Sequence, residues 1–206
     1  MADVEQAARG TLGGMPAPLR IAVIIASSRP ERVGPAVAGW VMEGTEKREA
    51  ATYELVDLAE QGLPNLDEPE PASSGSYVQP HTRRWADKVA GYDAFVFVTP
   101  EYNHGIPGQL KNALDFLYAE WNDKVAGIVC YGSNGGFRAA EQLKLTLNEL
   151  QVAVVRAQVE LSTYDDMADQ SEMTPRDYQP GKRTTMLTAV ERWAGALRPL
   201  REPDAS

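Results

Sequence analysis

Residues Phe95 to Leu117 combine a short apolar run, a polar loop and an amphipathic helix, and this unit limits the chain to a narrow group of folds. Phe95 to Val98 is wholly apolar, as expected of a strand that is covered on both faces of a sheet. Pro107 suits the first turn of a helix, and the apolar residues after it recur at helical spacing. The loop between strand and helix, Thr99 to Ile106, is therefore expected at the carboxyl end of the sheet, where open α/β folds bind their ligands.

The same order of apolar strand, loop and helix repeats along the chain, which predicts a parallel sheet with right-handed crossovers. Five strands are expected, at residues 19–26, 52–58, 95–98, 124–131 and 152–155. Five helices are expected. The first begins at Gly34, the second covers 81–91, the third begins at Pro107, the fourth ends near Leu150 and the fifth covers 182–197. These elements fit the doubly wound α/β class with a five-stranded parallel sheet of order 2-1-3-4-5. That order places the loops after the first and third strands on either side of one crevice.

Composition and charge exclude several kinds of partner. The formal net charge is −9 and the isoelectric point is near 4.8, so nucleic acid and anionic membrane surfaces are repelled on average. Apolar runs such as Ile21 to Ala26 fall short of the roughly 20 residues that a membrane span needs. A single cysteine, Cys130, predicts a cytoplasmic protein with a buried, inert thiol. We expect a flexible arm over residues 1–18, one domain over 19–198 and a flexible tail over 199–206.

The loop after the first strand carries groups that bind phosphate. Ser27 and Ser28 offer hydroxyls, and Arg29 and Arg32 offer guanidinium groups. The helix that begins at Gly34 offers backbone N–H groups at its N-terminus. The sequence contains neither the glycine pattern of dinucleotide folds nor the phosphate loop of nucleotide triphosphatases, so a monophosphate is the better match. A capped surface turn with solvated arginines is an equally good interpretation of this loop on its own.

The loop after the third strand carries groups suited to a planar heterocycle. Tyr102, Asn103 and His104 combine hydrogen-bonding groups with flat apolar surface, and Gly105 follows them. A flavin ring needs donors for its carbonyl oxygens and ring nitrogens and contacts on one face, while the other face stays open to a hydride donor. The glycine-rich turn Gly132 to Gly136 offers backbone N–H groups for the pyrimidine end, although a tight connection explains such a turn as well.

Other reactive residue types give weaker indications. His81 and His104 are far apart in the sequence and have no carboxylate at ligand spacing, so no metal site is expected. Asp57 and Glu101 lie near predicted strand ends, but the central strand separates their loops, and we do not expect a carboxylate pair. The long loop of residues 59–80 has the length of a lid or a subunit contact, and the sequence leaves both interpretations open.

Three motifs in these loops carry a family resemblance. They are ASSRPERVGPAVAGWV from Ala26, TPEYNHGIPGQLKNALDFL from Thr99 and YGSNGG from Tyr131. In these motifs the chain resembles the NAD(P)H-dependent FMN reductases of flavodoxin-like fold, which include quinone, azo and chromate reductases. The resemblance implies that the first loop holds the FMN phosphate through Ser27, Arg29, Arg32, Val33 and Gly34. It implies that the flavin ring is lined by Pro100, Glu101, Tyr102 and Asn103, with Gly132, Ser133 and Gly135 near its pyrimidine side.

Two residues of the first motif depart from the common family pattern. Ala26 stands where most members have glycine, and its methyl group is expected to tighten the turn. Arg32 stands where many members have serine, and it is expected to hold the phosphate by charge rather than by a hydroxyl.

The resemblance implies an oxidoreductase in which FMN carries the chemistry, so no catalytic side chain is expected. NADH or NADPH is the implied hydride donor. The implied acceptor is a quinone, an azo or nitro compound, a metal oxyanion or free flavin. One site shared by donor and acceptor predicts ping-pong kinetics, and the resemblance also implies a homodimer or homotetramer. Two alternatives stay open, a flavodoxin-like electron carrier and a redox-inactive flavin-fold scaffold.

Overall fold

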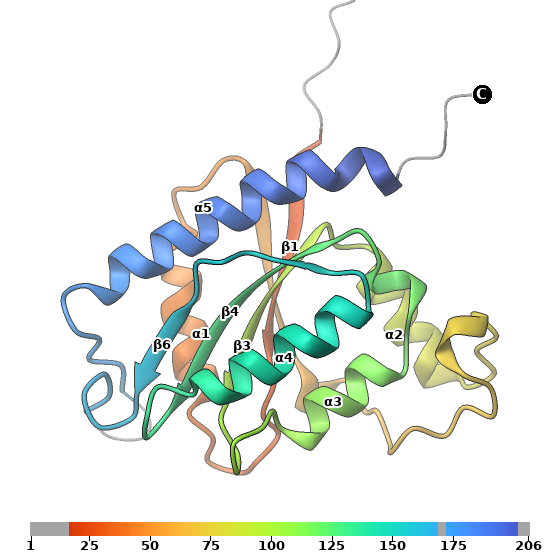
Figure 1. Cartoon of the computed structure of the whole chain (residues 1–206), viewed down its shortest axis with the longest axis horizontal. Helices are drawn as coiled ribbons and strands as arrows, with labels where there is room; N and C mark the ends of the chain where they lie inside the picture. The colour runs from red at the N-terminus through yellow and green to blue at the C-terminus, as the bar shows by residue number, and fades with distance from the viewer. Residues whose placement is uncertain (1–16, 169–171, 202–206) are drawn as a thin grey trace, which may run out of the picture.

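A parallel β-sheet forms the centre of the molecule (Figure 1). The computed structural model describes residues 17–168 and 172–201. Within them the strand order is β2-β1-β3-β4-β5, with β6 also paired to β4, and every pairing between these strands is parallel. The predicted doubly wound class and the order 2-1-3-4-5 are confirmed. The strands are β1 Leu19–Ile25, β2 Ala51–Asp57, β3 Ala94–Pro100, β4 Val125–Gly132, β5 Ala153–Val154 and β6 Val159–Ser162.

The edge of the sheet beyond β4 differs from the predicted single strand at 152–155. β5 pairs with Val125 and Ala126 at the start of β4, whereas β6 pairs with residues 129–132 at its end. Two short strands therefore share one edge of β4, and the sheet has six strands rather than five. β6 has only four residues, and Glu160 separates its two apolar ones, so its sequence carries too little pattern for a prediction.

In the described residues, five α-helices cover the two faces of the sheet. α2, α3 and α4 pack on one face, where Phe95, Phe97 and Trp121 form an aromatic cluster, and α1 and α5 pack on the other. Both faces of β1, β3 and β4 are thus covered, which explains their continuous apolar sequences. The helices are α1 Gly34–Glu43, α2 Pro80–Ala90, α3 Gly108–Asp115, α4 Phe137–Glu149 and α5 Gln179–Leu197. Short 3-10 helices occupy Leu58–Glu60, Ala72–Ser74, Ala119–Trp121 and Arg198–Arg201.

An ion-pair cluster fixes the last described residues against the amino end of the sheet. Asp93, just before β3, binds Arg198 at 3.0 Å and Arg201 at 2.6 Å. The predicted arm of residues 1–18 and the predicted tail of residues 199–206 lie largely outside the described part of the chain.

The long loop of residues 59–80 is held against α3 by one amide side chain. Asn112 accepts a hydrogen bond from the backbone N of Leu66 at 2.9 Å and donates one to the carbonyl of Pro64 at 2.7 Å. Glu68 accepts from the backbone N of residues 78 and 79 and so closes the far end of the loop. Hydrogen bonds therefore give this loop a defined course in spite of its length.

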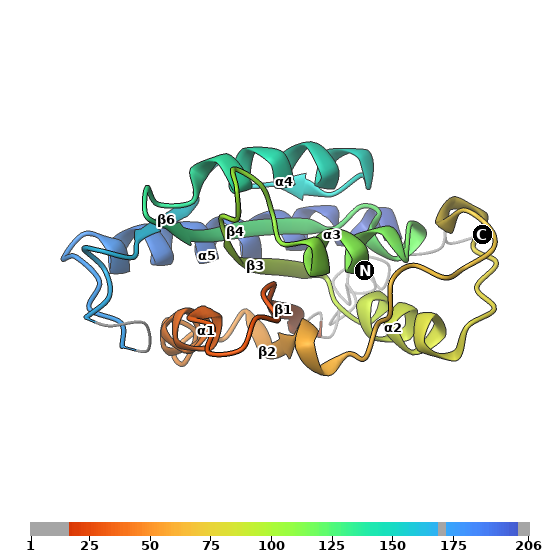
Figure 2. The same cartoon turned by 90° about the horizontal axis from the view of Figure 1, so that it is seen from below.

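The loops that follow β1, β3 and β4 come together at the carboxyl edge of the sheet, at the bottom of Figure 1 and on the side seen in Figure 2. Backbone hydrogen bonds hold them together just past the strands. Ala26 N donates to Val98 O at 3.0 Å, and Glu101 N donates to Tyr131 O at 2.9 Å. This edge holds the candidate site.

Candidate functional site

A cavity of about 200 Å³ lies where the carboxyl ends of β1, β3 and β4 meet. Its lining combines residues of the loops predicted to bind a ligand with residues from other segments. The predicted residues that line it are Arg29, Val33, Pro100, Glu101, Tyr102 and Gly132. The others are Tyr131, Thr163 and Met167. The two loops on either side of the switch point therefore face one cavity, as the strand order implied.

The loop after β1 leaves the N-terminus of α1 open to an anion. α1 begins at Gly34 with Pro35 in its first turn, and Val33 at the N-cap makes no side-chain cap. No acidic residue lies in that first turn, so the positive end of the helix dipole is not neutralised there. Arg29 is exposed and, like Val33, lines the cavity. This part of the cavity thus offers a phosphate both a cation and N–H donors.

Ser27 and Tyr131 lie between the loops after β1 and β4. Ser27 is buried, and its Oγ lies 3.4 Å from the Oη of Tyr131. A Cβ at Gly34 would lie 2.9 Å from Ile25 Cγ2 and 3.0 Å from Ser27 Oγ, so glycine lets α1 begin this close to β1. Burial raises the pKa of Tyr131 to about 12, so its hydroxyl stays neutral at physiological pH.

Arg32 is paired within the protein rather than free at the cavity. Its guanidinium group forms an ion pair with Asp57 at the end of β2, and both side chains are largely buried. The other carboxylate oxygen of Asp57 accepts from the backbone N of Ala59 at 3.0 Å. Asp57 therefore balances the charge of Arg32, which leaves Arg29 as the cation that faces the cavity.

The loop after β3 is a tight β-turn that presents Tyr102. Tyr102 and Gly105 exchange backbone hydrogen bonds of 2.9 and 3.0 Å. Asn103 and His104 between them have φ angles of 51° and 69°, and two successive positive φ angles are typical of a type I′ turn. A Cβ at Gly105 would lie 2.8 Å from Gln142 Oε1, so a larger residue here would have to displace the amide that accepts the hydrogen bond from Ile106. The turn exposes Asn103 and His104, and of these three polar residues only Tyr102 lines the cavity.

Two residues of α4 hold this loop at both of its ends. The carboxylate of Glu101 accepts hydrogen bonds from the backbone N of Arg138 at 3.0 Å and from its Nη1 at 2.6 Å. One turn later, Gln142 accepts from the backbone N of Ile106 at 2.8 Å. Burial raises the pKa of Glu101, but the hydrogen bonds and charge of Arg138 outweigh burial and hold that pKa below its usual range. Glu101 and Asp57 thus each bind an arginine and not each other.

Glycines set the shape of the turn after β4. Gly135 and Gly136 have φ angles of 78° and 74°, and a Cβ at Gly136 would lie 2.7 Å from backbone atoms of Tyr131. Gly132 lines the cavity, whereas Ser133 is exposed to solvent and Gly135 is buried in the turn. Of the three residues predicted for the pyrimidine end, the cavity therefore contacts Gly132.

Sequence reasoning missed three lining residues. Tyr131 ends the predicted strand 124–131, so its position at the carboxyl edge follows from the sheet order, as it does for the loops. Thr163 and Met167 follow β6, in a stretch whose sequence shows only polar, irregular character. No local pattern in that stretch indicates a position at the cavity.

Residues 19–166 match the family described as NADPH-dependent FMN reductase. The chain belongs to this family. It is 43% identical over 158 residues to an NAD(P)H-dependent FMN reductase of Schizosaccharomyces pombe, covering 76% of this chain and 79% of the relative. It is 31% identical over 134 residues to a quinone reductase of Pseudomonas putida, covering 62% and 68%. The flavoenzyme FerB of Paracoccus denitrificans, an NAD(P)H:acceptor oxidoreductase, shares the fold, with a TM-score of 0.66, 22% identity and coverage of 86% and 98%.

The family uses FMN. The cavity of this member offers groups suited to the phosphate of FMN and groups suited to its ring. Arg29 and the uncapped N-terminus of α1 form a donor set for a phosphate dianion, whereas Ser27 is buried behind the cavity lining, against Tyr131. The Nε of Arg32 is buried without a hydrogen-bond partner in the described residues, but Arg32 does not line the cavity. Tyr102 and Tyr131 supply flat aromatic surface on the strand-end side of the cavity.

The described residues contain neither a metal-binding cluster nor a membrane-spanning helix. No cluster of three or more His, Cys, Asp or Glu side chains among residues 17–168 and 172–201 could hold a metal ion. In the same ranges, no helix combines the length and the hydropathy that crossing a bilayer requires. Cys130 is buried, as predicted, and burial raises the pKa of its thiol to about 12.

Proposed function

We propose that this chain is an FMN-containing oxidoreductase that takes a hydride from NADH or NADPH and delivers it to a small acceptor such as a quinone. When bound, FMN supplies the hydride chemistry through its ring. One observation carries the proposal: a loop suited to a phosphate and a loop suited to a planar ring line the same cavity. The relatives named as FMN and quinone reductases support the choice of donor and acceptor.

The residues of the chain bind and orient the cofactor in this proposal. Arg29 and the N–H groups of α1 hold the phosphate, with Ser27 beside them. Pro100 and Tyr102 contact the ring from the β3 side, and Gly132 contacts it from the β4 side. No acid or base is assigned, because a protein that transfers hydride through a flavin mainly has to place the flavin and its partners.

Anaerobic mixing of the FMN-loaded protein with NADH or NADPH tests this function. We expect the visible flavin absorbance to bleach and to return when para-benzoquinone is added. Steady-state rates should follow ping-pong kinetics, because one cavity serves the donor and the acceptor in turn. If neither NADH nor NADPH bleaches the flavin, the result would favour an electron carrier. If the protein does not bind FMN, the result would favour a redox-inactive scaffold.

We further propose that residues 19–198 form the FMN-binding domain of a cytoplasmic homodimer or homotetramer. The single cysteine, Cys130, supports a reducing compartment, since the chain has no second thiol with which to form an internal disulfide. Azo and nitro compounds, metal oxyanions and free flavin are further candidate acceptors.

A further inference from the structure

One wall of the cavity comes from a segment that lies mostly beyond the family match, which ends at residue 166. This segment, residues 162–168 and 172–179, is here called the strap, and it contributes Thr163 and Met167 to the cavity. We infer that the strap is the wall against which the electron acceptor docks, and that Asp166 is the positioning residue that fixes this wall. The inference rests on the proposed function, because it concerns the second substrate of that reaction.

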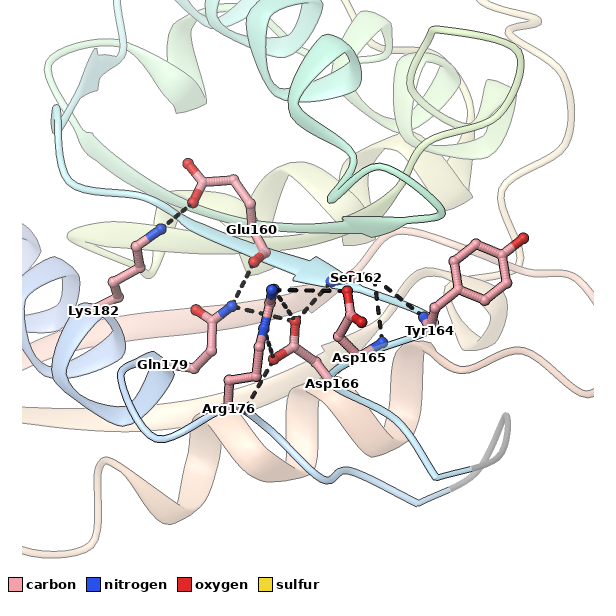
Figure 3. Close-up of polar contacts among 8 residues, drawn as sticks. All are labelled: Glu160, Ser162, Tyr164, Asp165, Asp166, Arg176, Gln179 and Lys182. Carbon is pink, nitrogen blue, oxygen red and sulfur yellow. Dashed lines mark hydrogen bonds and ion pairs between the residues drawn. The ribbon is translucent and has the colours of Figure 1, made fainter.

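A buried carboxylate ties the two ends of the strap together (Figure 3). The Asp166 side chain is 0% exposed. It accepts from the backbone N of Ser162 at 2.8 Å and from the Nε2 of Gln179 at 3.3 Å. Arg176 donates three further hydrogen bonds, from its backbone N at 2.9 Å, its Nε at 3.1 Å and its Nη2 at 2.8 Å. Because a buried charge is costly without its partners, this cluster favours one geometry of the strap.

The strap is attached directly to the turn that is expected to contact the flavin. The backbone N of Thr163 donates to the carbonyl of Gly132 at 3.1 Å, and Gly132 itself lines the cavity. The hydroxyl of Ser162 accepts from the backbone N of Tyr164 at 3.2 Å and of Asp165 at 3.3 Å, which fixes the turn after β6. A shift in the Asp166 cluster would therefore move a wall of the cavity.

The two strap residues that line the cavity, Thr163 and Met167, have uncharged side chains that carry a hydroxyl and a thioether. Tyr164 beside them is 79% exposed, and in Figure 3 its ring points away from the Asp166 cluster. Thioethers and aromatic rings contact planar molecules well, and a hydroxyl donates to a carbonyl oxygen. The described strap residues carry a net charge of −3, from Asp165, Asp166, Glu172 and Asp177 against Arg176. Such a wall suits a neutral planar acceptor with carbonyl oxygens and repels an oxyanion.

Three variants separate a docking wall from a segment that only supports the fold. Asp166→Asn keeps the size of the side chain but replaces one acceptor oxygen with a donor, and it leaves Arg176 with only the more distant carboxylate of Asp165, at 3.7 Å, as a counter-charge. Thr163→Val replaces the hydroxyl of a cavity-lining residue with a methyl group and keeps the backbone hydrogen bond to Gly132. Glu172→Gln removes one strap charge, as Asp166→Asn does, but lies outside the Asp166 cluster, so it is the matched control.

Steady-state and half-reaction kinetics of the FMN-loaded proteins give the first readout. Asp166→Asn should raise the KM for para-benzoquinone by about tenfold to a hundredfold, as expected when a substrate-positioning wall moves. Thr163→Val should raise it by roughly threefold to tenfold, the effect of one lost hydrogen bond. Glu172→Gln should leave it unchanged. In all three variants the rate of flavin bleaching at saturating nicotinamide should match the wild type. In Asp166→Asn and Thr163→Val the quinone KM should rise by a larger factor than the Kd for FMN. The wild type should also reduce para-benzoquinone with a higher kcat/KM than chromate.

Amide hydrogen exchange gives a second readout that does not depend on turnover. Asp166→Asn should speed the exchange of the Thr163 and Arg176 amides, and Glu172→Gln should not. If exchange speeds up while the quinone KM stays unchanged in both Asp166→Asn and Thr163→Val, the strap is only structural and the inference is wrong. An equal fall in bleaching rate and quinone turnover would also overturn it, because the strap would then act on the flavin. If wild-type flavin is not bleached by either nicotinamide, the proposed function itself fails, and the inference falls with it.

Discussion

Replacing Arg29 with alanine should weaken the binding of FMN and leave the binding of riboflavin, which lacks the phosphate, unchanged. Arg29 is exposed on the cavity side of the loop after β1, whereas Asp57 holds the neighbouring Arg32. A hydrogen bond to a charged group contributes about 1.5–3 kcal/mol, and tenfold in Kd corresponds to about 1.4 kcal/mol. The Kd for FMN should therefore rise roughly 10-fold to 150-fold. Quenching of flavin fluorescence during titration of the apoprotein measures both ligands.

Arg32→Ala is the matched control for this experiment, because it removes the same charge from the same loop. Arg32→Ala should mainly lower the stability of the folded protein, because it leaves the largely buried Asp57 without its ion-pair partner. Thermal unfolding of the apoprotein measures that loss of stability. If Arg29→Ala weakens riboflavin as much as FMN, Arg29 does not contact the phosphate. If Arg32→Ala weakens FMN more than Arg29→Ala does, the ion pair with Asp57 opens on binding and the assignment of the two arginines is reversed.

Three further predictions follow from the same geometry. Tyr102→Ala should change the absorbance spectrum or the bleaching rate of bound flavin with little loss of FMN affinity, because the phosphate ligands stay in place; an unchanged spectrum and rate would remove Tyr102 from the ring site. Burial raises the pKa of Asp166, but the hydrogen bonds from Arg176 outweigh burial and lower that pKa. The ionised carboxylate of Asp166 therefore stabilises the folded state fully above about pH 4, and this stabilisation disappears as the pH falls through the lower pKa of the folded state. Denaturant unfolding at falling pH should show this loss in the wild type and not in Asp166→Asn. Cys130 should resist alkylation by iodoacetamide at mildly alkaline pH until the protein unfolds, and rapid labelling of the folded protein would contradict its burial.

The centre of the fold could be predicted because each central strand carries its own local pattern. Residues Phe95 to Val98 are apolar without interruption, and the structure buries them on both faces of the sheet. The edge of the sheet could not be predicted in the same way. β6 is held in place by its pairing with β4, and Glu160 interrupts the apolar pattern of its four residues.

The candidate site could be predicted where its residues end a strand and not where they depend on a distant partner. Arg29 and Tyr102 lie in the loops after β1 and β3, and Gly132 ends β4, so the sheet order brings all three to one cavity. Arg32 was expected to serve the phosphate by its charge. Its partner Asp57 lies 25 residues further along the chain, at the end of another strand, and no local pattern connects the two.

The strap follows a different rule, because a side-chain cluster rather than a sheet determines its shape. In the sequence, Asp166 belongs to a polar, irregular stretch and resembles a solvated surface carboxylate. In the structure it is fully buried, and its partners Ser162, Arg176 and Gln179 come from both ends of the strap. The cofactor loops are thus fixed by the strand order, whereas the acceptor wall is fixed by this cluster. Relatives that keep the cofactor loops but replace Asp166 and Arg176 should therefore retain FMN and differ from this protein in the acceptors that they reduce.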